Sequence, residues 1–202
     1  MIAIIDYEMG NLRSVQKAFA YLGFEAKVTG DVRDLAAASH VVLPGVGAFG
    51  EAMANLERTG LIAGIHQSVK EGKLFLGICL GLQLLFEKSQ EDCCAKGLSL
   101  LPGEAKKIPA VPGLKIPHMG WNILRYRDNP LLKGLGEPCF VYYVHSFYVE
   151  PACPEHVIGT AFYGREFPVA VNKENIYGLQ FHPEKSGREG LKILKNFAEM
   201  KY

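Results

Sequence analysis

Cys79 is the residue whose surroundings most clearly predict chemistry. It is the central residue of Gly-Ile-Cys-Leu-Gly (77–81), between an apolar run and a segment with helical spacing. A strand that turns straight into a helix strains its apex residue, and side chains two positions to either side would collide, which explains both glycines. We expect a nucleophilic thiol at the C-terminal edge of a sheet, where the helix start favours the thiolate. A small buried core residue is the competing interpretation.

The backbone around this turn predicts an oxyanion site. The N–H of Leu80 would point to the same side as the thiol and stabilise an oxyanion. The segment 44–50 (Pro-Gly-Val-Gly-Ala-Phe-Gly) follows another predicted strand, and its glycines let the backbone approach a substrate carbonyl and donate a second N–H. Gly45, Gly47 and Gly50 also match the dinucleotide fingerprint, but the next strand ends in Cys79 instead of the expected acidic residue. A nucleotide-binding oxidoreductase is the alternative from a different class.

A nucleophilic cysteine requires a base, and His182 is the best-placed histidine. It follows a predicted strand at 177–181 and precedes Pro183 and Glu184. Residues i and i+2 of an extended chain face the same side, and the proline biases His182 toward extended geometry. The Glu184 carboxylate would therefore reach the imidazole, select its tautomer and stabilise the imidazolium. An exposed turn is the competing interpretation of this tripeptide, but together with Cys79 it predicts a thiol triad.

The remaining histidines and cysteines carry weaker signals. His118 and His145 lie near aromatic residues and could line a site or an interface, whereas His156 lies in a proline-rich turn. Five cysteines is an odd number, with no C-x-x-C and no accompanying histidine cluster, which argues against zinc. We expect free thiols in a reducing compartment, the cytoplasm, and no metal or cofactor.

Composition excludes several partners. The chain has 202 residues and a net charge of +1, which gives no electrostatic reason for a nucleic-acid or acidic-membrane partner. No apolar run approaches the roughly 18 residues of a membrane span. The apolar start lacks a basic region and is interrupted by Asp6, so we expect a strand and not a signal peptide.

The first ninety residues alternate between strand and helix patterns. Apolar runs predict strands at 2–7, 24–29, 40–43 and 73–78. Helical spacing predicts helices at 12–22, 31–38 and 51–71, with a break near Gly60, and another helix over 80–88. Such alternation is typical of a doubly wound α/β fold, with a parallel sheet covered by helices on both faces.

The second half predicts strands followed by a closing helix. We expect strands at 140–149, 157–162, 168–172 and 177–181 and an amphipathic helix at 190–200. Residues 102–117 contain four prolines and two glycines and predict a loop or a broken edge. Hairpin-like strands beside a parallel sheet suggest a mixed sheet, and no linker divides the chain, so residues 1–202 are expected to form a single domain.

With these pieces assembled, the sequence resembles the class I glutamine amidotransferases, which have a flavodoxin-like fold. More narrowly, it is similar to the glutaminase subunits of imidazole glycerol phosphate synthase. The similarity runs over essentially the whole chain, and Pro-His-Met-Gly-Trp-Asn (117–122) is its most specific part. The other matching segments are 6–7, 10–14, 43–50, 77–83, 142–146 and 182–186.

The resemblance implies a role for each matching residue. Cys79 would attack the side-chain amide of glutamine and form a glutamyl thioester as ammonia leaves, while His182 moves protons and Glu184 orients it. Val46 N–H would be the second oxyanion donor, correctly oriented only when a partner is engaged. Either Glu87 or Glu91 would contact the ammonium of glutamine. The other residues implied to bind glutamine are Gly47, Gln83, Ser146 and Phe147.

The resemblance also implies a partner. Ammonia would pass to a (β/α)8 cyclase subunit in a heterodimer, which makes imidazole glycerol phosphate and AICAR in histidine biosynthesis. Asn11, Trp121 and Lys185 match positions at that contact. Leu82 and Phe147 depart from the family's frequent Met and Tyr. The remaining alternatives are a related glutaminase that supplies ammonia to a surface-sugar amidation enzyme, and a cysteine hydrolase or peptidase acting alone.

Overall fold

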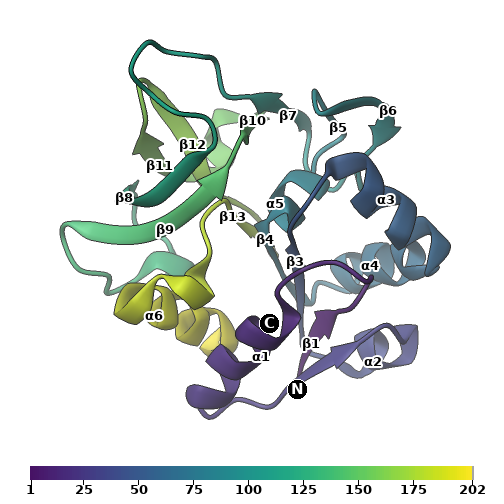
Figure 1. The fold of residues 1–202 in the computed structure, drawn as a ribbon. Coiled ribbons are helices and arrows are strands. Elements are labelled where there is room, and N and C mark those ends of the chain that lie inside the picture. The colour runs from purple at the N-terminus through teal and green to yellow at the C-terminus, as the bar shows by residue number, and fades with distance from the viewer. Residues whose placement is uncertain (202) are drawn as a thin grey trace.

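A nine-stranded sheet forms the centre of the computed structural model, which describes residues 1–201 (Figure 1). Its strand order is β2-β1-β3-β4-β13-β12-β11-β8-β9. The strands that pair in parallel are β1 (Ile2–Ile5), β2 (Ala26–Thr29), β3 (His40–Gly45), β4 (Leu74–Cys79) and β13 (Ile176–Leu179). Antiparallel pairing continues the sheet through β12 (Glu166–Lys173), β11 (Val157–Phe162), β8 (His118–Tyr126) and β9 (Cys139–His145).

Helices cover both faces of the parallel half, and each face has its own apolar core. In β1, Ile2 and Ile4 enter one core, whereas Ala3 and Ile5 enter the other, as expected when successive side chains alternate between faces. The first core is closed by α1 (Leu12–Tyr21) and α6 (Gly187–Glu199). The second is closed by α2 (Val32–Ala37), α3 (Phe49–Arg58) and α4 (Leu61–Lys70).

A second, four-stranded sheet has the order β10-β7-β5-β6 and lies beyond the short helix α5 (Leu80–Leu84) (Figure 1). Only β5 and β7 pair in parallel within it. Its strands are β10 (Phe147–Pro151), β7 (Gly103–Lys107), β5 (Lys88–Ser89) and β6 (Asp92–Lys96), and three short 3-10 turns complete the chain: η1 (Pro130–Leu132), η2 (Pro154–His156) and η3 (Pro183–Lys185).

The predicted α/β class with a mixed sheet is confirmed, and so are the elements predicted up to Cys79. The sheet is not mostly parallel, however, because four of its neighbouring strand pairs are parallel and four are antiparallel. The predicted helix break falls at Gly60, which precedes α4 with a φ of 70°. A positive φ is costly for residues with a Cβ, so glycine at this junction lets two helices follow each other at an angle.

From residue 80 onward the structure departs from several of the predictions. The helix expected over 80–88 ends at Leu84, because the Glu87 N–H donates to the Gly103 carbonyl and the chain enters β5. The expected loop at 102–117 contains β7, and β8 was not predicted. The strand expected over 140–149 is divided at Ser146 into β9 and β10, which belong to different sheets.

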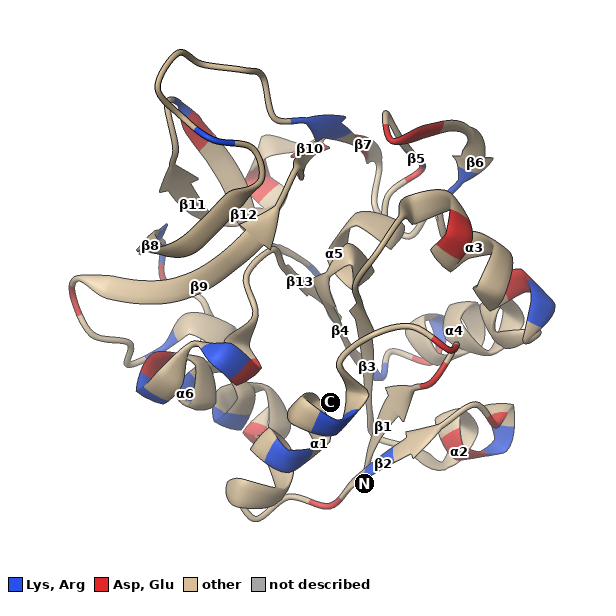
Figure 2. Cartoon of the chain, in the orientation of Figure 1, with Lys and Arg blue, Asp and Glu red and all other residues tan. Residues whose placement is uncertain are grey.

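Charged residues lie mainly on the outer helices and loops, with both signs interspersed (Figure 2). In contrast, β9 contains no Lys, Arg, Asp or Glu, and β8 contains only Arg125. No helix within residues 1–201 has the combined length and apolarity that a membrane crossing needs.

Candidate active site

The turn at Cys79 has the strained geometry that the sequence predicted. Cys79 ends β4 with φ 57° and ψ −111°, and α5 begins at the next residue. A Cβ on Gly77 would lie 2.6 Å from the Gly81 carbonyl oxygen, and a Cβ on Gly81 would overlap the Leu43 carbonyl of β3. Both glycines are therefore required sterically, which confirms the reason inferred from the pattern.

The Cys79 sulfur lies among polar groups although the residue is buried. Its thiol donates to the Val144 carbonyl oxygen at 3.8 Å and accepts from Gln180 Nε2 at 3.8 Å. The Gln180 side chain is held in turn, because its Oε1 accepts from Gln83 Nε2 at 3.1 Å. Gln180 was missed by the sequence-based predictions, although it stands two residues before His182 on the same extended segment.

His182 and Glu184 form the predicted pair. His182 Nδ1 lies 2.9 Å from Glu184 Oε1, and the two side chains are 3% and 1% exposed. His182 has extended backbone angles, and its N–H donates to the Tyr142 carbonyl at 3.0 Å. The Ser186 hydroxyl donates to the His182 carbonyl at 2.6 Å. The segment after β13 is thereby fixed, and β13 lies directly beside β4, which ends in Cys79.

The electrostatics of this group favour a protonated His182. Burial alone would lower the pKa of His182, but the Cys79 sulfur and the Glu184 carboxylate stabilise the imidazolium and raise this pKa to about 9. His182 Nε2, the nitrogen turned away from Glu184, is buried without a hydrogen-bond partner. The arrangement thus has a thiol, an imidazole with one free nitrogen and a carboxylate that fixes the other nitrogen, as proton transfer requires.

A pocket of about 280 Å³ opens over Cys79 and His182. Its size, at the small end for ligand pockets, suits a molecule such as an amino acid and is too small for a dinucleotide. Gly47 lies in this pocket, so the glycine-rich segment serves the thiol site. The predicted oxyanion and glutamine-binding residues all line it: Val46, Gly47, Leu80, Gln83, Ser146 and Phe147.

The structure distinguishes the two glutamates between which the sequence could not decide. Glu91 lines the pocket, and its Oε2 accepts from the Phe49 N–H at 2.8 Å at the start of α3. Glu87 does not line the pocket, and its Oε2 accepts from the Gly103 N–H at 2.9 Å. Glu91 is therefore the carboxylate available to a bound cationic group.

Behind the pocket, His118 and His145 form a buried pair with Nδ1 and Nε2 2.9 Å apart. Burial is the main reason that the pKa of each imidazole is lowered to about 4, and in His145 the neighbouring His118 and His182 contribute to the lowering. Both side chains are therefore neutral near pH 7. His145 lines the pocket, so one of the two roles considered for it, lining a site, is the one observed.

The residues predicted at a partner interface lie outside the pocket lining. Asn11 directly precedes α1, Lys185 is exposed in η3, and Trp121 is 57% exposed on β8. A Cβ on Gly187, at the start of α6, would lie 3.9 Å from the Trp121 ring. Trp121 is therefore beside the start of α6, five residues after His182.

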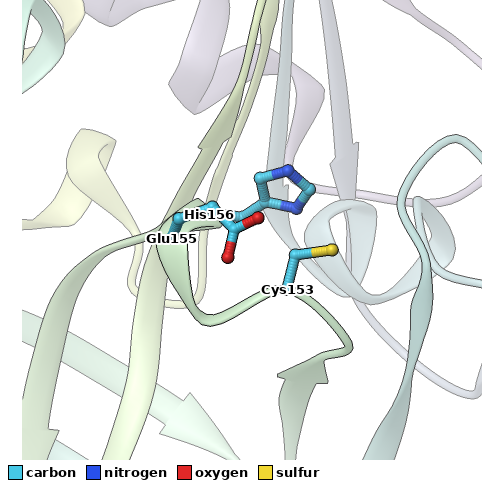
Figure 3. A group of neighbouring side chains, drawn as sticks. All are labelled: Cys153, Glu155 and His156. Carbon is cyan, nitrogen blue, oxygen red and sulfur yellow. The ribbon is translucent and has the colours of Figure 1, made fainter.

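One further group of donor side chains lies on η2, away from the pocket lining. The Cys153, Glu155 and His156 side chains approach one another there (Figure 3), with their donor atoms within 4.8 Å. The sequence-based predictions missed this group, because they considered only C-x-x-C spacing and histidine clusters. The signal that could have found it is the spacing Cys-x-x-His with a glutamate between. Glu155 is exposed, and all donors come from one turn, so the group alone does not make a metal centre. All five cysteines are free.

Several known proteins match this chain over nearly its whole length. Residues 3–200 match the model of the family described as "Glutamine amidotransferase class-I". The chain is 54% identical to the imidazole glycerol phosphate synthase subunit HisH of Moorella thermoacetica, over 98% of this chain and 94% of the relative. It is 50% identical to the subunit of that name from Listeria innocua, over 99% and 96% of the two chains.

The similarity of fold extends to more distant proteins. A solved structure described as a glutamine amidotransferase superposes with a TM-score of 0.77 over 98% of both chains, at 19% sequence identity. The expected flavodoxin-like amidotransferase fold is thus confirmed.

Replacing Glu184 by Gln tests the electrostatics of the triad. Because the carboxylate is one of two groups that raise the pKa of His182 to about 9, its neutralisation lets His182 deprotonate at lower pH. We expect the His182 pKa to fall by about 1 unit or more, as measured by NMR titration of the imidazole Cε1–H. Glu57→Gln, an exposed carboxylate on α3, is the control. An unchanged midpoint in Glu184→Gln would contradict the assignment.

Proposed function

The chain belongs to the class I glutamine amidotransferase family, and we propose that it is the glutaminase subunit of imidazole glycerol phosphate synthase in histidine biosynthesis. The observation that carries this function is the near full-length match to subunits of that name, in a chain whose pocket is lined by Cys79 and His182, with Glu184 hydrogen-bonded to His182. In this role the chain hydrolyses glutamine to glutamate and ammonia.

In the first half-reaction the Cys79 thiolate attacks the side-chain amide carbon of glutamine and forms a C–S bond. The carbonyl oxygen becomes an oxyanion that the Leu80 N–H stabilises, with the Val46 N–H as second donor. The His182 imidazolium gives its Nε2 proton to the amide nitrogen. The C–N bond then breaks, ammonia leaves and a glutamyl thioester remains.

In the second half-reaction a water molecule replaces ammonia. His182, now neutral, takes a proton from this water through Nε2 as the oxygen attacks the thioester carbonyl. The tetrahedral intermediate collapses, the C–S bond breaks and glutamate leaves, which regenerates the thiolate and the imidazolium. Glu184 keeps the proton of Nδ1 in place throughout and stabilises the imidazolium.

The amino-acid head of glutamine is held by other residues that line the pocket. Gln83 and the backbone at Gly47, Ser146 and Phe147 offer polar contacts, and Gln83 Nε2 is already fixed because it donates to the Phe147 carbonyl at 3.3 Å. The Glu91 carboxylate is the partner for the α-ammonium group. Binding both ends fixes the amide carbon relative to the sulfur.

An apolar strip on β8 and β9 supports the proposed partner, a (β/α)8 cyclase subunit in a heterodimer. Outward-facing residues Met119 and Trp121 are 62% and 57% exposed, and Ile123 pairs with exposed Phe140 across the two strands. These strands carry almost no charge (Figure 2). Exposed apolar groups of this size are typical of protein interfaces, with Asn11 and Lys185 as polar contacts at the edge.

There is a chemical reason for the ammonia to pass directly from one subunit to the other. Free ammonia is mostly protonated near pH 7 and is then not nucleophilic, so delivery through the partner protects it. A related glutaminase that serves a surface-sugar amidation enzyme would keep the same pocket, and it remains the second candidate. We place the proposed enzyme in the cytoplasm, where its free thiols remain reduced.

Replacing Cys79 by Ala separates glutamine hydrolysis from the use of ammonia. We expect the glutamine-dependent rate of the assembled synthase to fall by at least ~10³-fold, because no nucleophile remains. The rate with added ammonium salts should persist, since the partner carries out that step. Both rates are measured as imidazole glycerol phosphate formation. Loss of both activities would show that the thiol is not confined to hydrolysis.

Replacing Glu91 by Gln tests recognition of the substrate head. The amide retains an acceptor for the Phe49 N–H but loses the charge that pairs with the α-ammonium group, so KM for glutamine should rise about tenfold. Glu87→Gln is the matched control and should leave KM unchanged, because Glu87 lies outside the pocket lining. Steady-state glutaminase kinetics of the complex measure both, and the reverse result would exchange the roles of the two glutamates.

Replacing Trp121 by Ala tests the apolar strip as the partner interface. Loss of this exposed aromatic anchor should weaken binding of the cyclase subunit at least about tenfold, as measured by calorimetric titration. Val32→Ala, on α2 next to the opposite edge strand β2, removes an exposed apolar residue as a control and should leave the affinity unchanged. Equal affinities for both variants would remove Trp121 from the interface.

A further inference from the structure

A chain of hydrogen bonds connects β8 to the wall of the pocket. Asn122 Nδ2 lies 3.2 Å from His118 Nε2, and His118 Nδ1 lies 2.9 Å from His145 Nε2. His145 Nδ1 lies 2.8 Å from the Phe147 carbonyl oxygen. Three side chains thus link the β8 strand to the backbone that lines the glutamine pocket at Phe147.

The direction of this chain follows from which atoms can donate. The Phe147 carbonyl only accepts, so His145 carries its proton on Nδ1 and donates to it. Because His145 is neutral, its Nε2 must accept, and His118 therefore donates from Nδ1. His118 is neutral as well, so its Nε2 accepts from Asn122 Nδ2. Every link has one donor and one acceptor, and both tautomers are determined.

The side chains that form this hydrogen-bond chain are also held rigidly. The His118 ring is stacked between Tyr143 and Tyr163, with ring centroids 4.8 and 4.1 Å away. Asn122 is fixed because its Nδ2 also donates to the Phe162 carbonyl at 2.9 Å. At the other end, the Phe147 carbonyl accepts from both His145 and Gln83, so both of its lone pairs are used.

The hydrogen-bond chain ends at Phe147, where the backbone passes from the large sheet to the small sheet. Ser146 separates β9 of the large sheet from β10 of the small sheet, and both Ser146 and Phe147 line the pocket. No regular strand pairing within one sheet holds this joint on both sides. On the side of the small sheet Phe147 pairs with Lys107, and the Ser146 carbonyl accepts from the Ile108 N–H at 2.9 Å. The donors from His145 and Gln83 hold the Phe147 carbonyl in addition.

We propose that His118 is a positioning residue, which acts through His145 to hold the Ser146–Phe147 backbone in the orientation that binds the head of glutamine. The proposal rests on the proposed glutaminase function and adds to it a determinant of substrate affinity outside the pocket lining. His118 begins the strand whose next residue, Met119, faces outward in the apolar strip. The substrate pocket is thereby connected to the strand on which the partner is proposed to dock.

Two substitutions of His118 separate hydrogen bonding from packing. His118→Phe keeps an aromatic ring between Tyr143 and Tyr163 but removes the donor to His145. His118→Asn removes the ring but places an amide nitrogen close to the position of Nδ1. We expect KM for glutamine to rise about tenfold in His118→Phe, because a buried acceptor loses its donor. The Asn variant should stay near the wild-type KM, and kcat should change less than about threefold in both.

The kinetics are measured in the assembled synthase, and thermal unfolding of each variant identifies any loss of folding. His66→Phe, an exposed histidine on α4, is the control. The reverse result, with His118→Asn impaired and His118→Phe normal, would overturn the proposal in favour of a packing role. Unchanged KM in both variants would also overturn it.

An NMR measurement tests the hydrogen bond from His118 to His145 without depending on catalysis. In the ¹⁵N-histidine-labelled protein, His145 Nε2 should shift toward the value of a free, unprotonated ring nitrogen in His118→Phe and stay near wild type in His118→Asn. If both variants have raised KM, a His145 shift unchanged by His118→Phe overturns the proposal. If the wild-type complex does not hydrolyse glutamine, the proposed function fails, and the ¹⁵N shifts still test whether His118 donates to His145.

Discussion

The lack of space around the Cys79 turn is the constraint on which the rest of the site depends. With φ at 57°, Cys79 occupies a backbone conformation that costs of order 1–3 kcal/mol for a residue with a Cβ. It persists because β3 and β4 are buried along their whole length and are in register, so that Gly45 pairs with Cys79. The Leu43 carbonyl against Gly81 fixes where α5 starts, and hence where the Leu80 N–H lies.

Sheet topology then brings the other polar groups of the site to this fixed point. Because β13 pairs in parallel with β4, the residues that follow both strands meet at the same edge. Gln180 and His182 are two apart in an extended segment and face the sulfur together, whereas Phe181 between them is buried in the core. The segment that follows β13 thus supplies both a donor to the thiol and the imidazole beside it.

The elements up to Cys79 and the contact between His182 and Glu184 were predictable because their signals are local. Strand and helix periods alternate clearly up to Cys79, and the reach of Glu184 to His182 depends only on residues two apart. The end of α5 was not predictable, because the distant Gly103 carbonyl sets it. Nothing local marks Ser146 either, since the apolar pattern runs on as the chain leaves one sheet for the other. Which of Glu87 and Glu91 lines the pocket was likewise not predictable, because the position of Glu91 depends on α3. Its carboxylate accepts from the N–H of Phe49, the first residue of that helix.

The strand β8 escaped prediction for a reason that is itself informative. Its outward positions carry Met119, Trp121 and Ile123, while inward His118 is buried, which inverts the usual pattern of a sheet with one face in the core. Buried polar groups must find partners, and His118 finds His145 and Asn122. Exposed apolar groups likewise remain to be covered by another surface. Both features occur within residues 117–122. His118 needs hydrogen-bond partners on the buried face, and the adjacent Met119 and Trp121 leave apolar surface on the exposed face.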